Sequence, residues 1–263
     1  MQVKAKKSLG QHFLKDLGIA KKIADTIQPD MLPEADREKW GSLPVVEVGP
    51  GMGVLSQFLK ENGRTVKAVE LDAESVAFLH NAFPSLDVVE GDFLKMDLDS
   101  LFPDEMVLIG NYPYNISSQI FFKVLDNREK IPVVAGMLQK EVAQRICSGP
   151  GSKVYGILSV LLQAWYDCKY LFDVGPMVFS PAPKVTSGVI RLTRNSRNEL
   201  GCDEKKFKNV VKTAFGQRRK TLRNSIGGLV GADNPLLSEP IMGMRPEQLS
   251  VEDFIRITKA ITG

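Results

Sequence analysis

Val45-Val46-Glu47-Val48-Gly49-Pro50-Gly51-Met52-Gly53-Val54-Leu55 joins a short apolar run to a glycine-rich turn and then to a helical pattern. Glycine lets a chain turn tightly and approach a ligand closely, because it has no Cβ atom. At the carboxyl end of a first strand, such a turn is where open α/β sheets bind nucleotides. The segment therefore favours an α/β fold.

The rest of the chain between Leu43 and Leu192 agrees with this fold, because β-rich runs alternate with helical patterns. The expected strands are Pro44–Val48, Thr65–Glu70, Leu86–Glu90, Met106–Gly110, Val133–Gln139 and Gly188–Thr193. The expected helices are Ile19–Ile27, Gly53–Asn62, Ala73–Ala82, Ser117–Asn127, Glu141–Ser148 and Tyr155–Tyr166. Near-continuous apolar runs are typical of parallel strands covered on both faces. We predict a mostly parallel sheet.

The strand pattern ends near Arg197. Beyond it, Asp203–Ser225 is expected to form one or two helices and Val251–Ile261 a last one. We therefore predict two domains, a catalytic domain with a basic N-terminal arm over residues 1–197 and a small helical domain over residues 198–263.

The composition favours a globular protein in the cytoplasm. Hydrophobic residues make up 43% and charged residues 25% of the chain, and no apolar run approaches the roughly 20 residues that span a bilayer. The cysteines Cys147, Cys168 and Cys202 are far apart and predict reduced thiols. His12 and His80 are distant from one another and from every cysteine, which argues against a metal site and against a histidine base.

The net charge of +3 hides an uneven distribution. Residues 1–22 hold six Lys and one acidic residue, whereas residues 23–183 hold 13 basic and 22 acidic residues. Residues 184–263 hold 15 basic and 8 acidic residues. An acidic middle between two basic ends suggests that the ends grip a polyanion, although solvated basic ends are an equal alternative.

The glycine spacing distinguishes two kinds of nucleotide site. A dinucleotide site has the pattern G-x-G-x-x-G, but here Gly49, Gly51 and Gly53 alternate and Val54 stands where the third glycine would be. Glu47 precedes the first glycine by two positions, and a carboxylate there suits a cationic ligand better than a pyrophosphate. A tight turn without a ligand is the alternative.

Two further carboxylates follow expected strands. Glu70 ends the second strand, where a carboxylate can accept both hydroxyls of a ribose. Asp92 follows the third strand and is placed to accept an adenine amino group, while Phe93 or a neighbour covers the ring. Each could be a solvated loop acid, but acidic residues at three successive strand ends favour a binding site in the crevice at that edge.

Gly110-Asn111-Tyr112-Pro113-Tyr114-Asn115 comes directly after the fourth expected strand. This segment resembles the motif of amino-methyltransferases, and the resemblance implies an adenine amino nitrogen as the target. That nitrogen is a weak nucleophile, because its lone pair is delocalised into the ring. The Asn111 side-chain oxygen and a backbone carbonyl near Tyr112-Pro113 can hold its N–H groups and favour tetrahedral geometry, since Pro113 restricts the backbone there. The Tyr114 ring offers a stacking surface worth about 1–3 kcal/mol per base. A plain turn is the alternative.

The Asn111–Tyr114 motif resembles the Asn-x-Pro-Tyr motif of amino-methyltransferases. Nearly the whole chain resembles the small-subunit ribosomal RNA adenine dimethyltransferases, through Ser8–Leu14, Glu47–Gly53, Glu70, Gly91-Asp92, Asn111–Ser117, Phe179–Val185 and Ala214–Leu222. The resemblance implies a Rossmann-like class I methyltransferase with a mostly parallel seven-stranded sheet, a helical C-terminal domain and S-adenosylmethionine as cofactor. The implied reaction is dimethylation of the N6 amino groups of two adjacent adenines near the 3′ end of 16S rRNA, in ribosome biogenesis.

The motifs also imply individual roles. The expected cofactor-binding residues are His12, Leu14, Glu47, Gly49, Gly51, Gly53, Glu70, Asp92 and Asn111. The expected catalytic residues are Asn111, Pro113, Tyr114 and Phe179, with Phe179 as a second stacking wall for the flipped base. Many family members have Leu in place of Tyr112, and some have Asn in place of His12. We expect Tyr112 to need only its backbone here, and His12 still to hydrogen-bond.

A basic segment, Lys205–Arg223, holds eight basic residues and no acidic one. Apolar residues recur in it at helical spacing, so a basic face lies opposite an apolar stripe. The expected RNA-binding residues are Lys205, Lys208, Lys212, Arg218, Arg219, Lys220 and Arg223, which suit phosphates rather than base edges. A solvated face is the alternative. Lys4, Lys6 and Lys7 are hypothesised to form a mobile arm that orders when substrate binds.

Other functions remain open on the sequence alone. They are a methyltransferase of large-subunit RNA, a non-catalytic assembly or transcription factor of the same fold, and a DNA adenine methyltransferase. The segments Phe179–Val185 and Gly216–Lys220 favour the small-subunit branch. A DNA methyltransferase is disfavoured, because the sequence has no recognisable domain for reading a DNA sequence. The expected partner is 16S rRNA in the small ribosomal subunit, and we expect a monomer without membrane contact.

Overall fold

The computed structural model describes residues 3–262 and divides into two compact units. Unit 1 comprises the chain up to Ala143 together with Cys168–Arg194, and unit 2 comprises Gln144–Asp167 together with the chain from Asn195 onward. Residues 144–167 thus belong to unit 2, although the division expected from the sequence assigns them to the catalytic domain. The functional division at residue 197 stays a prediction.

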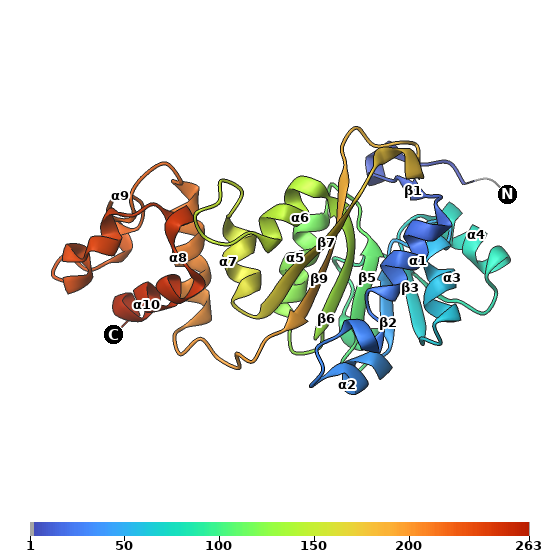
Figure 1. Ribbon diagram of the computed structural model, residues 1–263, viewed down its shortest axis with the longest axis horizontal. Coiled ribbons are helices and arrows are strands. Elements are labelled where there is room, and N and C mark those ends of the chain that lie inside the picture. The colour runs from blue at the N-terminus through green and yellow to red at the C-terminus, as the bar shows by residue number, and fades with distance from the viewer. Residues whose placement is uncertain (1–2, 263) are drawn as a thin grey trace. The chain divides into compact units, whose positions relative to one another are not determined.

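Unit 1 is built on a seven-stranded sheet with the order β4-β3-β2-β5-β6-β9-β7 (Figure 1). The strands are β2 (Val45–Val48), β3 (Val66–Glu70), β4 (Asp87–Glu90), β5 (Val107–Asn111), β6 (Val133–Gln139), β7 (Tyr166–Val174) and β9 (Ser187–Arg194). The neighbours from β4 to β6 pair in parallel, and β9 is antiparallel to β6. The predicted fold class, with a mostly parallel seven-stranded sheet, is confirmed.

The burial of each strand explains why the sequence predicted some strands and missed another. All four residues of β2 are buried, as are the first six of β6, so both read as continuous apolar runs. The edge strand β7 was not predicted, and its first residue was assigned to a helix. Most of its residues are exposed or half-buried, and several are charged, so it has no continuous apolar run.

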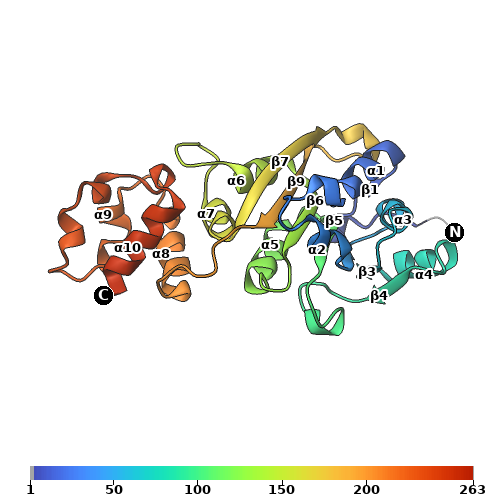
Figure 2. The same cartoon turned by 60° about the horizontal axis from the view of Figure 1, so that its bottom comes forward.

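Helices cover both faces of this sheet. The helices that include unit 1 residues are α1 (Leu17–Asp25), α2 (Arg37–Ser42), α3 (Val54–Glu61), α4 (Ala73–Ala82), α5 (Ser117–Asp126) and α6 (Lys140–Cys147). Helix α1 packs against α3, and Ile23 and Leu59 are fully buried there. Figure 2 shows α1 and α5 on opposite sides of the sheet, and α5 buries Ile120, Phe121 and Val124.

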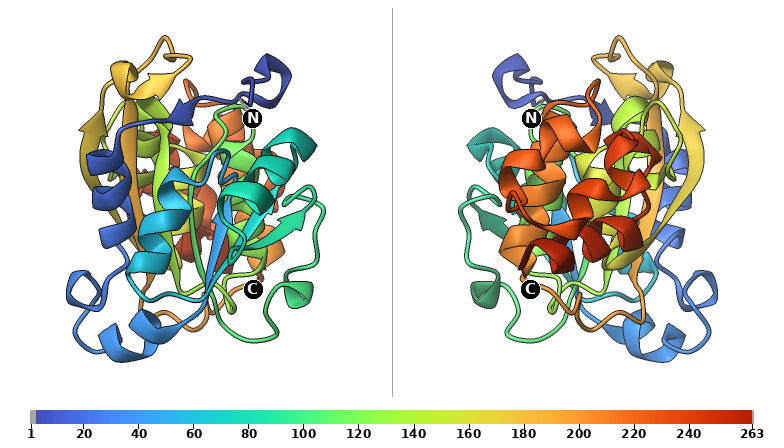
Figure 3. Two further views of the ribbon diagram at one scale, coloured as in Figure 1. Left: turned by 90° about the vertical axis from the view of Figure 1, so that its right-hand side faces the viewer. Right: turned by 90° about the vertical axis from the view of Figure 1, so that its left-hand side faces the viewer.

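The N-terminal segment is attached to unit 1 by a small second sheet. Strand β1 (Phe13–Leu14) pairs antiparallel with β8 (Phe179–Ser180), and Leu14 lies opposite Phe179. The Lys15 amide also donates to the Val178 carbonyl at 2.9 Å. Figure 3 shows this blue segment beside the gold connection between β7 and β9. Residues at the start of the chain are thereby brought to the carboxyl edge of the main sheet.

Unit 2 is helical and has its own aromatic core. It contains α7 (Ile157–Gln163), α8 (Glu204–Gly216), α9 (Leu222–Ser225) and α10 (Val251–Thr262). The ring of Phe215 lies 6.0 Å from that of Tyr155 and 5.9 Å from that of Phe254. The predicted apolar stripe of α8 is buried, and the expected segment Asp203–Ser225 forms two helices separated by residues 217–221.

Within residues 3–262, no helix combines the length and apolar character needed to cross a membrane.

Candidate active site

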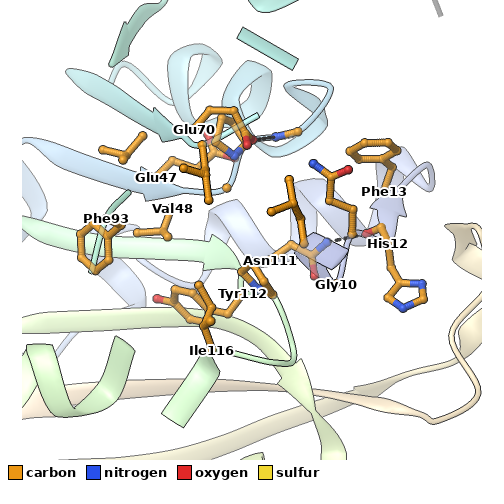
Figure 4. A pocket seen from close by; sticks show the side chains of 18 of the residues that line it. Gly10, His12, Phe13, Glu47, Val48, Glu70, Phe93, Asn111, Tyr112 and Ile116 are labelled. Atoms are coloured by element: carbon orange, nitrogen blue, oxygen red, sulfur yellow. Dashed lines mark hydrogen bonds between the residues drawn. The ribbon is translucent and has the colours of Figure 1, made fainter. Parts of the chain in front are cut away.

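A pocket lies in unit 1 at the carboxyl ends of β2, β3 and β5, where the N-terminal segment reaches the sheet (Figure 4). Of the residues predicted to bind cofactor or to act in catalysis, ten line it: His12, Leu14, Glu47, Gly49, Gly51, Glu70, Asp92, Asn111, Pro113 and Tyr114. Tertiary folding thus brings together residues from five separate parts of the sequence. Gly53 and Phe179 are not among the lining residues.

The glycine turn between β2 and α3 forms the floor of the pocket. Gly49, Gly51 and Gly53 all have positive φ angles, of 69°, 57° and 72°, which residues with a Cβ rarely adopt. A Cβ on Gly51 would lie 2.9 Å from Cδ1 of Phe13. A Cβ on Gly53 would instead lie 2.6 Å from Cε2 of Phe83, away from the pocket. Gly53 therefore seats helix α3, whereas Gly51 lets Phe13 close over the turn.

Glu70 connects the glycine turn to the end of β3. Its Oε2 accepts the Gly51 amide at 3.0 Å, and its Oε1 accepts the Asp72 amide at 2.9 Å. The side chain is only 5% exposed, and burial raises the pKa of Glu70 above its usual range. A carboxylate has about four acceptor positions, so the Glu70 side chain keeps the capacity to accept a ligand hydroxyl.

Glu47 is a buried acid behind the same turn. It is 1% exposed, and the Ser56 hydroxyl donates to its Oε2 at 2.5 Å. Burial raises the pKa of Glu47 to about 8, because the charged form loses its hydration. At neutral pH the group is therefore mostly protonated. A cation bound beside it would favour the ionised form.

Asp92 and Phe93 form the wall that follows β4. The Asp92 Oδ1 accepts the Leu94 amide at 3.0 Å, and its Oδ2 lies 3.6 Å from the ammonium of Lys95, an exposed residue. Phe93 is 4% exposed, and the Lys123 ammonium lies 5.3 Å from its ring centre. The wall combines an acceptor and an apolar ring side by side, as an adenine requires.

Asn111 stands between the glycine turn and the N-terminal segment (Figure 4). Its side-chain Nδ2 donates to the His12 backbone carbonyl at 3.0 Å. A carbonyl oxygen can only accept, so this bond determines which end of the amide faces His12. The Oδ1 of Asn111 is consequently directed away from His12 and keeps its acceptor capacity.

The two tyrosines after Asn111 are held by their hydroxyl groups. Tyr114 and Ser187 share a hydrogen bond of 2.5 Å, and the Tyr114 ring lies 5.4 Å from that of His12. Burial raises the pKa of the Tyr114 phenol, which stays neutral. Tyr112 is only 1% exposed and donates to the Ala135 carbonyl at 2.7 Å. The side chain of Tyr112 is therefore part of the core, and this packing does not test the expectation that only the Tyr112 backbone acts at the site.

The predicted N-terminal arm is tied to unit 1 by polar contacts. Lys6 forms ion pairs with Asp72 and, at 3.1 Å, with Glu74, and Gln11 donates to Asp72 at 3.2 Å. At the other end, Nδ1 of His12 lies 2.8 Å from the Pro181 carbonyl oxygen. The pocket lining includes residues 9–14 of this arm.

Comparison with known proteins covers both units. The family described as "Ribosomal RNA adenine dimethylase" matches residues 2–263. The chain belongs to this family. A relative from Parabacteroides distasonis named "Ribosomal RNA small subunit methyltransferase A" is 61% identical over 97% of this chain and 93% of its own. Another relative with this name, from Bacteroides thetaiotaomicron, is 62% identical over 98% of this chain and 94% of its own.

Solved structures agree with the fold of this dimethylase family. A dimethyladenosine transferase from Plasmodium falciparum has a TM-score of 0.72 at 24% identity and covers 94% of this chain and 96% of its own. The 23S rRNA methyltransferase ErmE has a TM-score of 0.60 at 24% identity and covers 95% of this chain and 100% of its own. At such identity the likeness concerns the fold alone, and it does not separate small-subunit from large-subunit substrates.

Phe179 has a different environment from the one expected of a stacking wall in this dimethylase. It is 2% exposed and belongs to the core that also contains Leu14 and Val174. Its strand partner Leu14, from the N-terminal segment, belongs to the same core. The stacking role of Phe179 stays a prediction, and it requires the buried ring to become accessible to the base.

The basic residues of unit 2 fall into two groups in this member of the family. Lys205, Lys208 and Lys212 recur at helical spacing on α8, whose opposite face is buried. Because α8 ends at Gly216, the remaining predicted residues do not continue its face. Arg218 donates to the Ser152 carbonyl at 3.4 Å, and Arg223 donates to the Leu237 carbonyl at 3.0 Å. Both have structural contacts besides any RNA contact.

Sequence reasoning missed three side chains that shape the dimethylase pocket. Phe13 lies over Gly51, Asp72 caps α4 and holds Lys6 and Gln11, and Ser187 holds Tyr114. Phe13 falls in a segment that the family resemblance had singled out. Ser187 had no such local signal, because its contact with Tyr114 depends on the register of β9 against β6.

Proposed function

We propose that this chain transfers methyl groups from S-adenosylmethionine to the N6 amino groups of two adjacent adenines near the 3′ end of 16S rRNA. The protein is a ribosomal RNA adenine dimethylase by family. The observation that carries the proposed chemistry is the hydrogen bond from the Asn111 amide to the His12 carbonyl, within a pocket that also contains Glu70 and Asp92. It turns a neutral acceptor, Oδ1 of Asn111, toward an incoming amine.

The donor set of the pocket fits S-adenosylmethionine better than a dinucleotide. Three carboxyl groups, those of Glu47, Glu70 and Asp92, line it, and they suit a cation, a ribose and an adenine amine rather than a pyrophosphate. Glu70 would accept the ribose hydroxyls, Asp92 the adenine amino group, and Glu47 would face the cationic amino-acid end. When bound, the cofactor supplies a methyl group on a sulfonium.

The target base would be held by the corner from Asn111 to Tyr114. Oδ1 of Asn111 and a backbone carbonyl accept the N–H groups of the adenine amine, which frees its lone pair from the ring. The Tyr114 ring stacks on the base, which contributes about 1–3 kcal/mol. As the N–C bond forms, the S–C bond breaks, and the acidic product ammonium releases its proton to water. Positioning supplies most of the acceleration, and no histidine base is required.

The small subunit is favoured over the large one as the substrate by the named relatives. Those from Parabacteroides and Bacteroides are small-subunit methyltransferases at 61% and 62% identity, whereas the likeness to the 23S enzyme is 24%. In unit 2, Lys205, Lys208 and Lys212 would contact phosphates. We propose further that the enzyme acts as a monomer in the cytoplasm.

Methylation of ribosomal subunits tests this function. Small and large subunits from a strain without adenine dimethylation would be incubated with the purified protein and labelled cofactor, and the modified RNA mapped by mass spectrometry. We expect two adjacent N6,N6-dimethyladenines near the 3′ end of 16S rRNA and none in the large subunit. Label in the large subunit alone would support the large-subunit alternative, and binding without incorporation would support a non-catalytic assembly factor.

A further inference from the structure

We propose that the Tyr112 side chain is a positioning residue, whose hydrogen bond to the Ala135 carbonyl sets the geometry at which Asn111 receives the target amine. The inference rests on the proposed function and deepens it. It assigns a role to a side chain that belongs to a pocket-lining residue and is almost fully buried.

Tyr112 is attached to strand β6 at two points. Its backbone amide donates to the Met137 carbonyl at 2.9 Å, and its phenol hydroxyl donates to the Ala135 carbonyl at 2.7 Å. The backbone bond continues the pairing of β5 with β6 by one residue beyond Asn111 and Met137. The bond from the phenol adds a second attachment, which fixes the side chain to the same strand.

The ring lies in a slot lined by two glycines. A Cβ on Gly110 would lie 3.2 Å from Cε1 of Tyr112, and a Cβ on Gly136 would lie 2.8 Å from Cε2. Gly136 also has a φ of +143°, which favours glycine, and it directly follows the acceptor residue Ala135. On the side of α5, the Phe121 ring packs edge-on at 5.7 Å and 71°. The slot matches a flat ring and holds it in one orientation.

This anchor acts on the neighbouring residue through strand geometry. Successive side chains of an extended chain point to opposite faces, so Tyr112, fixed against Phe121 of α5, holds Asn111 on the side of His12. Pro113, next along the chain, restricts the other end of the corner. The residues expected to hold the cofactor ribose and adenine, Glu70 and Asp92, come from other strands. Loss of the hydroxyl should therefore misplace the target site and leave cofactor binding intact.

The second methyl transfer should depend on the anchor more than the first. An unmodified adenine amine offers two N–H groups to the acceptors of the corner, whereas a monomethylated amine offers one. With one hydrogen bond left, the orientation of the nitrogen depends more strongly on where Asn111 is held. A loosened corner should therefore release a larger share of its product as N6-monomethyladenine.

The test is Tyr112→Phe in the full-length enzyme, with small ribosomal subunits as substrate. We expect kcat to fall about 10-fold, because a small displacement of a reacting group from its productive position slows an enzymatic reaction. The Kd for S-adenosylmethionine should stay within about twofold, and the ratio of monomethyl to dimethyl adenine should rise. Replacement of Tyr112 with p-aminophenylalanine keeps a donor for the Ala135 carbonyl and should restore both rate and product ratio.

The matched control is Tyr155→Phe. Tyr155 is also a buried tyrosine, but its hydroxyl has no hydrogen-bond partner within residues 3–262, so this variant should behave as wild type. A wild-type rate and product ratio for Tyr112→Phe would overturn the inference while the proposed function stands. Equal losses of rate and cofactor affinity, or failure of p-aminophenylalanine to rescue, would also overturn it. Failure of the wild-type enzyme to methylate small subunits would instead overturn the proposed function.

Discussion

The Asn111 amide nitrogen lies 3.0 Å from the backbone carbonyl oxygen of His12, a residue 99 positions earlier in the chain. This bond joins the N-terminal arm to the corner expected to receive the target adenine. It orients the Asn111 amide before any substrate arrives. Preorganised acceptors of this kind act without reorganisation at the moment of reaction.

Asn111→Ala should abolish most methyl transfer and leave cofactor binding nearly intact. Removal of one preorganised polar group at a reacting centre typically costs about 10²–10³ in kcat. Asn111→Asp should lose as much methyl transfer as Asn111→Ala. Its carboxylate would face the His12 carbonyl, and neither group can donate a hydrogen bond to the other. Single-turnover methylation and calorimetry of cofactor binding separate the two effects. Equal losses in both would contradict the role given to Asn111.

Glu70→Gln should weaken cofactor binding. The carboxylate accepts backbone amides from both Gly51 and Asp72, and a glutamine would turn a donor toward one of them. We expect a Kd for S-adenosylmethionine about 5- to 150-fold higher, because an uncompensated buried donor costs about 1–3 kcal/mol. Glu90→Gln is the matched control, since Glu90 is exposed and lies opposite Glu70 on β4. Wild-type affinity in the Glu70 variant would rule the role out.

Cofactor binding should release a proton below pH 8. The pKa of Glu47 is about 8 in the free protein, and a cation beside it would favour the ionised form. Affinity should therefore rise with pH up to about 8 and then level off, as linkage requires. Calorimetry in buffers of different ionisation enthalpy measures the proton. Glu47→Gln should abolish the release, and unchanged release in that variant would assign the proton to another group.

The same residue predicts how stability depends on pH. Between pH 4.5, the ordinary pKa of glutamate, and about 8, the folded protein keeps a proton on Glu47 that the unfolded chain has lost. The contribution of Glu47 to the free energy of unfolding has its full value below pH 4.5 and is lost as the pH rises through about 8. Denaturant unfolding of wild type and Glu47→Gln should therefore show a smaller decline in the variant. Parallel curves would contradict the raised pKa.

Lys6→Met should loosen the N-terminal arm. The lysine pairs with Asp72 and Glu74, and these carboxylates raise the pKa of Lys6. We expect faster hydrogen exchange in residues 6–15 and a weaker affinity for S-adenosylmethionine, because the arm lines the pocket. Lys4→Met is the control, since Lys4 is exposed. If exchange is slow in both variants, the β1–β8 ladder rather than Lys6 holds the arm.

The α8 lysines should control RNA affinity without affecting the cofactor. Combined replacement of Lys205, Lys208 and Lys212 with Ala should raise KM for small subunits. It should also lower the slope of log affinity against log salt by about 2–3, close to one per lost phosphate contact. Lys39→Ala is the control, because Lys39 lies on α2 of unit 1 and is not among the residues that line the pocket. An unchanged salt slope would favour a merely solvated face.

Local patterns in the sequence were sufficient for a mostly parallel α/β sheet and for the polar groups at its strand ends. The number of strands and the roles of His12 and Leu14 were implied by the family resemblance. Strands β2, β5 and β6 read as apolar runs because they are buried on both faces, and the glycines after β2 mark a turn. Glu47, Glu70 and Asp92 could be grouped because parallel strands end at one edge of a sheet. Each of these inferences depends on residues within a few positions of one another and on the regular geometry of the sheet.

Only the tertiary structure decided how the pocket is held. The contacts between Asn111 and His12, between Tyr112 and Ala135, and between Tyr114 and Ser187 join residues that are 99, 23 and 73 positions apart. The pairing of Phe179 with Leu14, and the edge strand β7, likewise depend on neighbours distant in the chain. A hydrogen bond or an exposed edge leaves no periodic pattern in the sequence, because either depends on which segments meet in space. The amino-acid sequence therefore determined which chemical groups this enzyme has at its strand ends, and the packing of the whole chain determined where those groups point.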